Sequence, residues 1–244
     1  MCRMFMLKGS FSSDFEGIFT SLQEVARVDP LLENKGPSDG SHSDGWGYLN
    51  ITDSKIEYVK FGTPIFHHEK LDTGDGVIMC HARNAAPNEP LGVNFAHPHY
   101  SSNDRFDFFL SHNGWFNKEG ISSILKRNDS AYHTDSEMFL YLVSSLEGEP
   151  ESRISEAIEL VKERGLIRSS ANLLFTVIDR KSQDYEAFYY SDAAAKSNYG
   201  TYQKLFLVRN ERWSGVFSSS IVKANSFHFT ENAEEVERGK LFML

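Results

Sequence analysis

The chain has 244 residues, of which 40% are hydrophobic and 13% aromatic, so it can build a sizeable packed core and is not a disordered protein. Lys and Arg total 25 against 34 Asp and Glu, which gives a net charge of -9 without any basic run. This balance argues against a nucleic-acid or an anionic-membrane partner.

The sequence contains two cysteines, Cys2 and Cys80. Cys80 lies in the apolar run Val77–His81, which is typical of a buried strand, so we expect no disulfide and a reducing compartment. The first apolar stretch is too short for a secretory leader, and no stretch is long enough to span a bilayer. We therefore expect a cytoplasmic protein.

The first third of the chain is expected to form strands and one helix. A strand at Arg3–Leu7 would hold Cys2 at the end of a sheet. Apolar residues at helical spacing from Phe15 to Val25 predict an amphipathic helix that ends before Pro30. The Gly-, Ser- and Pro-rich stretch 34–44 predicts an exposed loop. Further strands are expected at 44–49, 56–61, 77–81 and 106–110.

Helices are expected in the middle of the chain and strands again at its end. The helices lie at 121–125, from a cap at Asp135 or Ser136 to about Leu146, and at 152–164. The strands lie at 173–178, 185–190, 205–208, 216–219 and 227–229. No repeat or linker divides the chain, so we expect one α+β domain over residues 1–244, with two packed sheets and helices outside them.

Cys2 carries the most informative chemistry in the sequence. The initiator methionine is usually removed before a small second residue, and its removal would leave Cys2 with both a thiol and a free α-amine. An unperturbed α-amine has a pKa of about 7.7–8.0, which suits a group that takes up and returns a proton. Because the thiolate is the attacking form of cysteine, Cys2 can be nucleophile and base together.

Other residues supply the remaining parts of an amide-cleaving site. The side-chain amide of Asn113 and the backbone N–H of Gly114 can donate to a developing oxyanion. Arg83 can bind a carboxylate through two hydrogen bonds, and Asp135 can hold an ammonium group. The last two requirements describe the amino-acid end of free glutamine.

The motifs resemble, in this order, the glutaminase domain of the class-II glutamine amidotransferases, which are N-terminal-nucleophile hydrolases. The resemblance covers Cys2 to Leu146 and rests on Met1-Cys2 and five further blocks: His42-Ser43-Asp44-Gly45-Trp46-Gly47, His81-Ala82-Arg83, Asn94-Phe95-Ala96-His97-Pro98-His99, His112-Asn113-Gly114-Trp115 and Thr134-Asp135-Ser136-Glu137.

The resemblance implies a four-layer αββα sandwich and a role for each matching residue. Cys2 is implied as the nucleophile with its α-amine as base, and Asn113 with Gly114 as the oxyanion hole. The substrate-binding residues that it implies are Arg83 on the α-carboxylate, Asp135 on the α-amine, and the motif residues His81, His97 and Trp46. The histidines are expected to order loops rather than to transfer protons, and no cofactor or metal is implied.

The expected reaction is hydrolysis of the side-chain amide of L-glutamine through a γ-glutamyl thioester on Cys2. A related γ-glutamyl amide or peptide stays open as the substrate. The chain ends where a glutaminase domain would end, so we expect either a separate ammonia-accepting synthase as partner or an uncoupled hydrolase. The sequence leaves open whether the protein forms a homo-oligomer.

Two rival hypotheses use the same residues differently. A metal-dependent hydrolase would take its ligands from His81, His97, His99 and His112 with Asp44 or Asp135. Against it, no His-x-x-x-His or Cys-x-x-Cys motif accompanies these histidines, and all of them already belong to the amidotransferase pattern. A catalytically silent amino-acid-binding module would retain the fold without the reaction.

Overall fold

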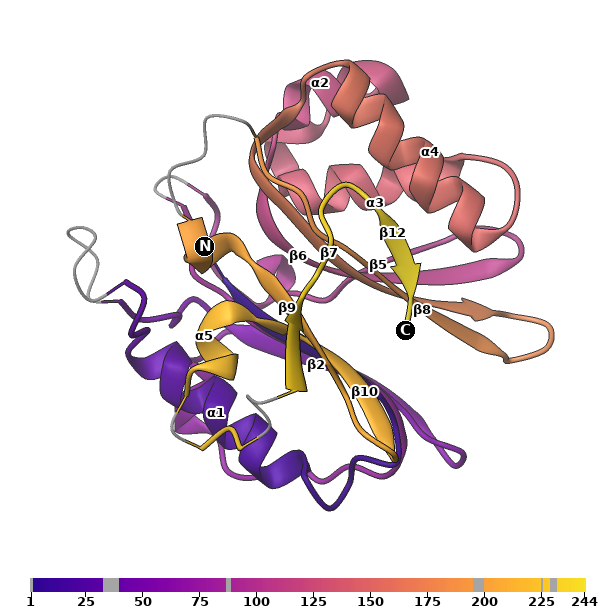
Figure 1. The fold of residues 1–244 in the computed structure, drawn as a ribbon. Coiled ribbons are helices and arrows are strands. Elements are labelled where there is room, and N and C mark those ends of the chain that lie inside the picture. Colours follow the sequence, from indigo (N-terminus) through magenta and orange to yellow (C-terminus); the bar gives the residue numbers. More distant parts are fainter. Residues whose placement is uncertain (1, 33–39, 87–88, 195–199, 225, 229–231) are drawn as a thin grey trace.

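A computed structural model describes residues 2–32, 40–86, 89–194, 200–224, 226–228 and 232–244. Within these ranges the chain forms two antiparallel sheets and five α-helices (Figure 1). The α+β class expected from the order of the elements is therefore confirmed.

The first sheet has seven strands, and β1 lies near its middle between β10 and β4. Its four residues Met4 to Leu7 are fully buried, because apolar layers cover both faces of the strand. Cys2 thus stands at the end of a central, well-anchored strand. In spatial order the strands are β11 (Ala233–Glu235), β9 (Leu205–Arg209), β10 (Trp213–Ser218), β1 (Arg3–Gly9), β4 (Gly76–Ala82), β2 (Trp46–Ile51) and β3 (Ile56–Phe61).

The second sheet has five strands with the long β6 and β7 paired at its centre. Asn113 and Gly114 belong to β6, opposite Asn172 and Ala171 of β7. In spatial order the strands are β12 (Leu241–Met243), β8 (Tyr185–Tyr190), β7 (Ile167–Asp179), β6 (Phe106–Phe116) and β5 (His99–Ser102).

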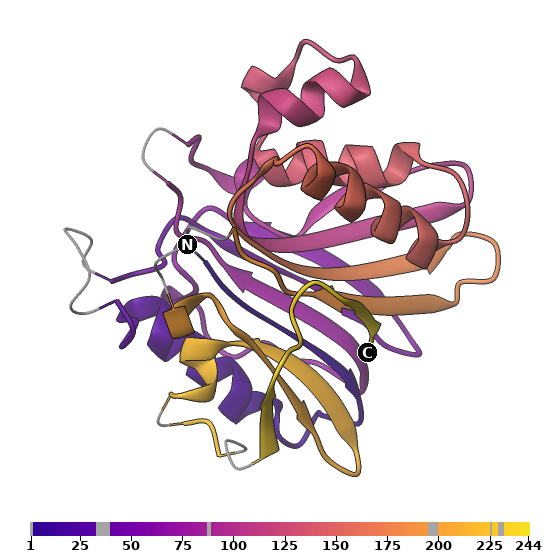
Figure 2. The same cartoon turned by 45° about the horizontal axis from the view of Figure 1, so that its top comes forward.

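Helices cover the outer faces of the two sheets (Figure 2). A third apolar cluster fills the space between the sheets. Phe15, Phe19 and Leu22 of α1 recur at helical spacing and pack on the first sheet, each contributing about 1.5–3 kcal/mol by burial. Met138 and Phe139 of α3 pack on the second sheet. The helices are α1 (Phe15–Arg27), α2 (Lys118–Leu125), α3 (Asp135–Ser145), α4 (Pro150–Glu163) and α5 (Ser219–Val222).

Most expected elements are present, and the exceptions are short. The strands at 56–61 and 185–190 have the expected bounds, whereas β5, β11 and β12 were not expected. The strand expected at 216–219 ends at Ser218, because Ser219 begins α5. Phe227 and His228 form no strand, and residue 229 lies outside the described residues, as does most of the loop expected at 34–44. Among the described residues, no helix combines the length and the apolar character that a membrane span needs.

Candidate active site

Cys2 is held at a point where three distant segments of the chain meet. It lies one residue before β1 and is 9% exposed. Its backbone N–H donates to Oδ1 of Asn113 over 3.0 Å, and its Sγ accepts from the backbone N–H of Asn84 at 3.4 Å. The thiol, the β6 amide and the segment after β4 are therefore neighbours, although their residues are up to 111 positions apart in sequence.

The Asn113 side chain offers a free donor beside Cys2. The residue is 1% exposed, and its Nδ2 has no hydrogen-bond partner in the part of the chain that the structure describes. Buried amide groups are nearly always paired, so this N–H₂ group has the capacity to donate to a bound ligand. Because Nδ2 and Oδ1 belong to one planar group and Oδ1 accepts from the Cys2 nitrogen, this donor lies close to Cys2.

Gly114 is required where β6 comes closest to β7. A Cβ at this position would lie 1.7 Å from the Ser170 carbonyl oxygen and 2.6 Å from Nε2 of His112. The strand pairing shifts register between Gly114 and Phe116, which marks a bulge rather than the strand tip that the sequence indicated. Glycine thus allows the close approach of the two strands at this position.

Arg83 is a buried cation without a carboxylate partner among the described residues. It directly follows β4 and is 4% exposed. Its Nη1 donates to the Pro90 carbonyl oxygen over 2.9 Å, and its backbone pairs with Gly45 and Asp44 at 2.8 and 3.0 Å. Within the described residues it forms no ion pair with an acidic side chain. Buried charges are normally paired, so this guanidinium suits an anionic ligand.

Asp135 begins α3 and joins it to the end of β6. Its Oδ2 accepts from the Phe116 backbone N–H over 2.7 Å, and burial raises its pKa to about 6. The helix cap is Thr134, which accepts from the Glu137 backbone N–H over 3.1 Å, so the expectation of a cap at Asp135 or Ser136 is wrong. Because Thr134 and Glu137 form the capping box, the Asp135 side chain is not needed to cap the helix.

His81, His97 and His99 form a buried row. The ring centroids of His81 and His97 lie 4.1 Å apart, and those of His97 and His99 lie 4.2 Å apart. Nε2 of His81 donates to the His112 carbonyl oxygen over 3.2 Å. Burial lowers the pKa of all three rings, to about 3 for His81, so they are neutral near pH 7. Neutral buried rings fit the expected ordering role better than proton transfer.

The histidine row does not provide a metal site. Across the described ranges, no group of three or more His, Cys, Asp and Glu side chains is placed to hold a metal ion. The rings of His81 and His97 are tilted by only 31°, so they stack on one another instead of converging on one point.

We expect the buried histidines to make the protein sensitive to acid. Burial lowers the pKa of five histidines, so their rings stay neutral in the folded state while the unfolded chain takes up protons below about pH 6.5. Above that pH the neutral rings do not reduce the free energy of unfolding. Below it the free energy of unfolding falls, by up to about 1.4 kcal/mol per pH unit for each ring. We expect the urea midpoint to fall steeply between pH 6.5 and 5. The five are His42, His81, His97, His99 and His112.

A matched pair of variants tests the cause of this acid sensitivity. His97→Gln should flatten the dependence of the unfolding free energy on pH by up to about 1.4 kcal/mol per pH unit, and the same substitution at the exposed His67 is the control. An unfolding free energy that stays constant from pH 7 to 5 in the unmodified protein would contradict the argument.

Trp46 lies on a different face of the first sheet from the histidine row. Its indole is 2% exposed and stacks on Phe61, with centroids 4.6 Å apart, in the apolar cluster that packs on α1. Its expected part in substrate binding stays a prediction. Asn84 was not foreseen, because it contacts Cys2 through its backbone N–H and its residue type carries no signal.

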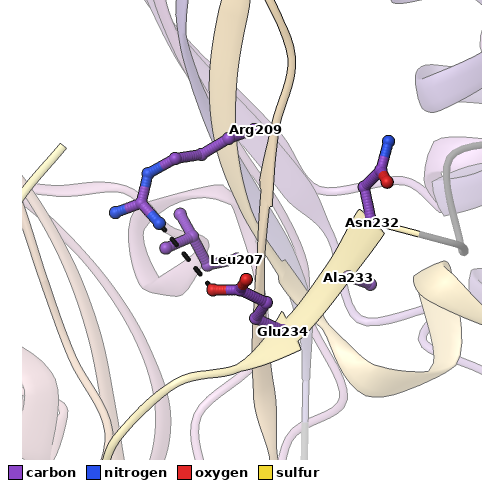
Figure 3. A pocket seen from close by; sticks show the side chains of 5 residues that line it. All are labelled: Leu207, Arg209, Asn232, Ala233 and Glu234. Carbon is purple, nitrogen blue, oxygen red and sulfur yellow. Dashed lines mark ion pairs between the residues drawn. The ribbon is translucent and has the colours of Figure 1, made fainter.

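A surface pocket of about 280 Å³ lies at the β11 edge of the first sheet (Figure 3). Arg209 and Glu234 face each other across it, 4.0 Å apart at their nearest charged atoms. Two strands, β9 and β10, separate β11 from β1, so this pocket is not part of the Cys2 site.

Solved structures share this fold. An allosteric regulatory enzyme of purine biosynthesis aligns over 99% of this chain and 46% of its own, with 17% identity and a TM-score of 0.65. Glutamine phosphoribosylpyrophosphate amidotransferase from B. subtilis aligns over 99% of this chain and 47% of its own, with 15% identity and a TM-score of 0.66. The chain thus spans about half the length of the solved structures that it matches.

No protein-family model and no curated protein sequence matches the chain. The structural likeness, at an identity below 20%, establishes the fold. The chain therefore has the fold of the matching half of glutamine phosphoribosylpyrophosphate amidotransferase, in agreement with the class-II glutamine amidotransferase resemblance of its sequence motifs.

Proposed function

We propose that the chain, once Met1 is removed, hydrolyses the side-chain amide of L-glutamine or of a related γ-glutamyl compound. The observation that carries this proposal is the contact between Cys2 and Asn113. Oδ1 of Asn113 holds the Cys2 nitrogen at 3.0 Å, while the buried Nδ2 has no partner among the described residues. A nucleophile therefore stands beside a preorganised oxyanion donor.

The reaction follows from these groups. The α-amine of Cys2 takes the thiol proton, and the thiolate attacks the δ-carboxamide carbon. Asn113 Nδ2 and the Gly114 N–H stabilise the oxyanion. The protonated amine gives its proton to the departing ammonia, which leaves a γ-glutamyl thioester. The amine then takes a proton from water, the resulting hydroxide attacks the thioester, and the proton returns to the thiolate as glutamate leaves.

Two residues would bind the amino-acid end of the substrate. The buried guanidinium of Arg83 would pair with the α-carboxylate and the carboxylate of Asp135 with the α-ammonium. His81 and His97 would order the surrounding loops. In this proposal the two sheets and their outer helices correspond to the αββα sandwich of N-terminal-nucleophile hydrolases.

The fate of the ammonia is a separate question. Glutamine phosphoribosylpyrophosphate amidotransferase carries about as much chain again beyond the region shared with this protein. We propose that a separate synthase accepts the ammonia, and that without one the enzyme acts as an uncoupled γ-glutamyl hydrolase. Both the coupled and the uncoupled enzyme are compatible with a homo-oligomer.

One experiment tests the function directly. Purified protein is sorted by mass spectrometry into forms with and without Met1, and each is assayed for ammonia release from glutamine and for glutamate release from γ-glutamyl dipeptides. Only the form that starts at Cys2 should react, because in the other form the Cys2 nitrogen belongs to a peptide bond. A mature form that releases neither product and forms no adduct with an electrophilic glutamine analogue would leave a silent binding module as the explanation.

Asp135→Asn should weaken substrate binding and stabilise the fold. Loss of the pairing with the α-ammonium should raise KM about 10–100-fold with a smaller change in kcat. Since the pKa of Asp135 is raised to about 6, ionisation costs stability above that pH, so the amide should add up to about 3 kcal/mol to the unfolding free energy at pH 7.

The same pKa sets a pH dependence for substrate capture. As the pH falls through about 6, Asp135 becomes protonated and can no longer pair with an ammonium, so kcat/KM should fall. Glu137→Gln is the matched control: it removes a charge from the same helical turn, retains the capping box and should leave KM unchanged. An unchanged KM in Asp135→Asn would remove Asp135 from the site.

A further inference from the structure

A buried charged cluster, formed by Arg3 and Asp29, lies next to the main chain of Cys2. Arg3 is fully buried, and its Nε donates to Oδ2 of Asp29 over 2.5 Å. Its guanidinium lies 3.6 Å from the centre of the Tyr202 ring. Its Nη1 donates to the carbonyl oxygen of Cys2 over 2.9 Å. Arg3 therefore connects the Cys2 main chain to a fixed carboxylate.

Asp29 is itself held from several directions. Its Oδ1 accepts from Ser220 Oγ at 2.7 Å and from the Leu31 N–H at 2.9 Å, and its Oδ2 also accepts from His42 Nε2 at 3.0 Å. Burial would raise the pKa of Asp29, but the His42 hydrogen bond and the charge of Arg3 hold it well below its ordinary value. The carboxylate is thus ionised and immobile, so it is a firm anchor for Arg3.

Cys2 needs such an anchor because the sheet does not supply one. The pairing of β1 with β4 begins at Arg3 and Ala82, one residue after Cys2. The Cys2 nitrogen is held by Asn113, which belongs to the second sheet, and its carbonyl oxygen by Arg3. Arg3 approaches from the outer side of the first sheet, where its strand neighbour Phe5 packs on α1.

Two contacts from opposite sides fix the rotation of the Cys2 main chain. This rotation decides where the α-amine and the thiol point relative to the Asn113 amide. A displacement of about 1 Å in such a group can cost about 10² in rate. We propose that Arg3 is a positioning residue that clamps the Cys2 carbonyl in the reactive orientation; this inference rests on the function proposed above.

The test compares Arg3→Lys with Ser220→Ala in the mature protein. A lysine retains the charge beside Asp29 but lacks the fork that also reaches the Cys2 carbonyl. Arg3→Lys should lower kcat about 10–100-fold and leave KM within about twofold, because Arg83 and Asp135 are untouched. Ser220→Ala removes a different bond to Asp29, so it should lower the urea midpoint and leave kcat unchanged.

A second readout does not depend on activity. In protein with ¹³C-carbonyl-labelled cysteine, Arg3→Lys should shift the NMR resonance of Cys2, whereas that of Cys80, in the middle of β4, should stay in place. If Arg3→Lys does not fold, the double variant Arg3→Met with Asp29→Asn, which leaves no unpaired buried charge, should show the same loss of kcat.

The outcomes separate the two proposals. Wild-type kcat together with an unmoved Cys2 resonance in Arg3→Lys would overturn the clamp, as would an equal loss of kcat in Ser220→Ala. If the unmodified mature protein releases no ammonia or glutamate, the proposed function fails, and the Cys2 resonance still reports whether Arg3 holds the carbonyl.

Discussion

Cys2→Ala is expected to lower kcat/KM for glutamine by at least about 10⁴-fold, because the thiol is the proposed nucleophile and no thioester can form without it. The substitution should cost little stability, since the hydrogen bonds of the thiol among the described residues are weak sulfur contacts with the main chain of Asn84. The measurement is ammonia release by the mature variant, with mass spectrometry to confirm that Met1 has been removed from it.

Cys80→Ala is the control for Cys2. Cys80 is fully buried between β1 and β2, and burial raises the pKa of its thiol well above the ordinary value, so it stays protonated and inert. Folded Cys80→Ala should retain activity, and iodoacetamide should modify Cys2 but not Cys80 in the native protein. Residual ammonia release by Cys2→Ala at more than a few per cent of wild type would contradict nucleophilic catalysis by Cys2.

Asn113→Ala is expected to lower kcat about 10²–10³-fold, the usual cost of losing an oxyanion donor. The effect should fall on kcat more than on KM, because Nδ2 would bind the oxyanion more strongly than the ground-state amide. Asn113→Asp separates the two ends of this side chain. It retains an oxygen to accept from the Cys2 nitrogen but places a negative charge where the oxyanion forms, so we expect a loss at least as large.

Asn172 provides the matched control on the neighbouring strand. It lies directly opposite Asn113, but its Nδ2 donates to the Gln203 carbonyl oxygen at 2.7 Å and its Oδ1 accepts from Ser191 Oγ at 2.8 Å. Asn172→Ala should therefore reduce stability and leave the kcat of the folded protein unchanged. If Asn113→Ala retained wild-type kcat, or lost no more than Asn172→Ala, the oxyanion role would have to be abandoned.

Long periodic elements were predictable from the sequence, whereas short edge elements were not. The apolar positions of α1 recur at helical spacing because one face packs on a sheet, so the pattern alone reveals the helix. β11 and β12 have three residues each and gain their stability from the strands beside them. Segments of that length carry too little periodicity to be recognised.

The sequence also does not show which of several neighbouring polar side chains binds a given backbone group. Thr134, Asp135 and Ser136 are all residue types that cap helices. Only the folded chain shows that Thr134 caps α3 while Asp135 binds the end of β6. The same holds for Arg3, whose type suggests a surface residue but whose side chain is fully buried against Asp29.

The sequence by itself determined the α+β class, most of the strands and helices, and which residues are candidates for nucleophile, oxyanion donor and substrate contacts, because these depend on local periodicity and residue chemistry. The tertiary structure alone decided that Cys2 meets Asn113. It also decided that, among the described residues, Nδ2 of Asn113 has no partner and the buried Arg83 has no counter-charge. Such relations join residues far apart in the chain. They follow from how two sheets pack, which no local pattern records.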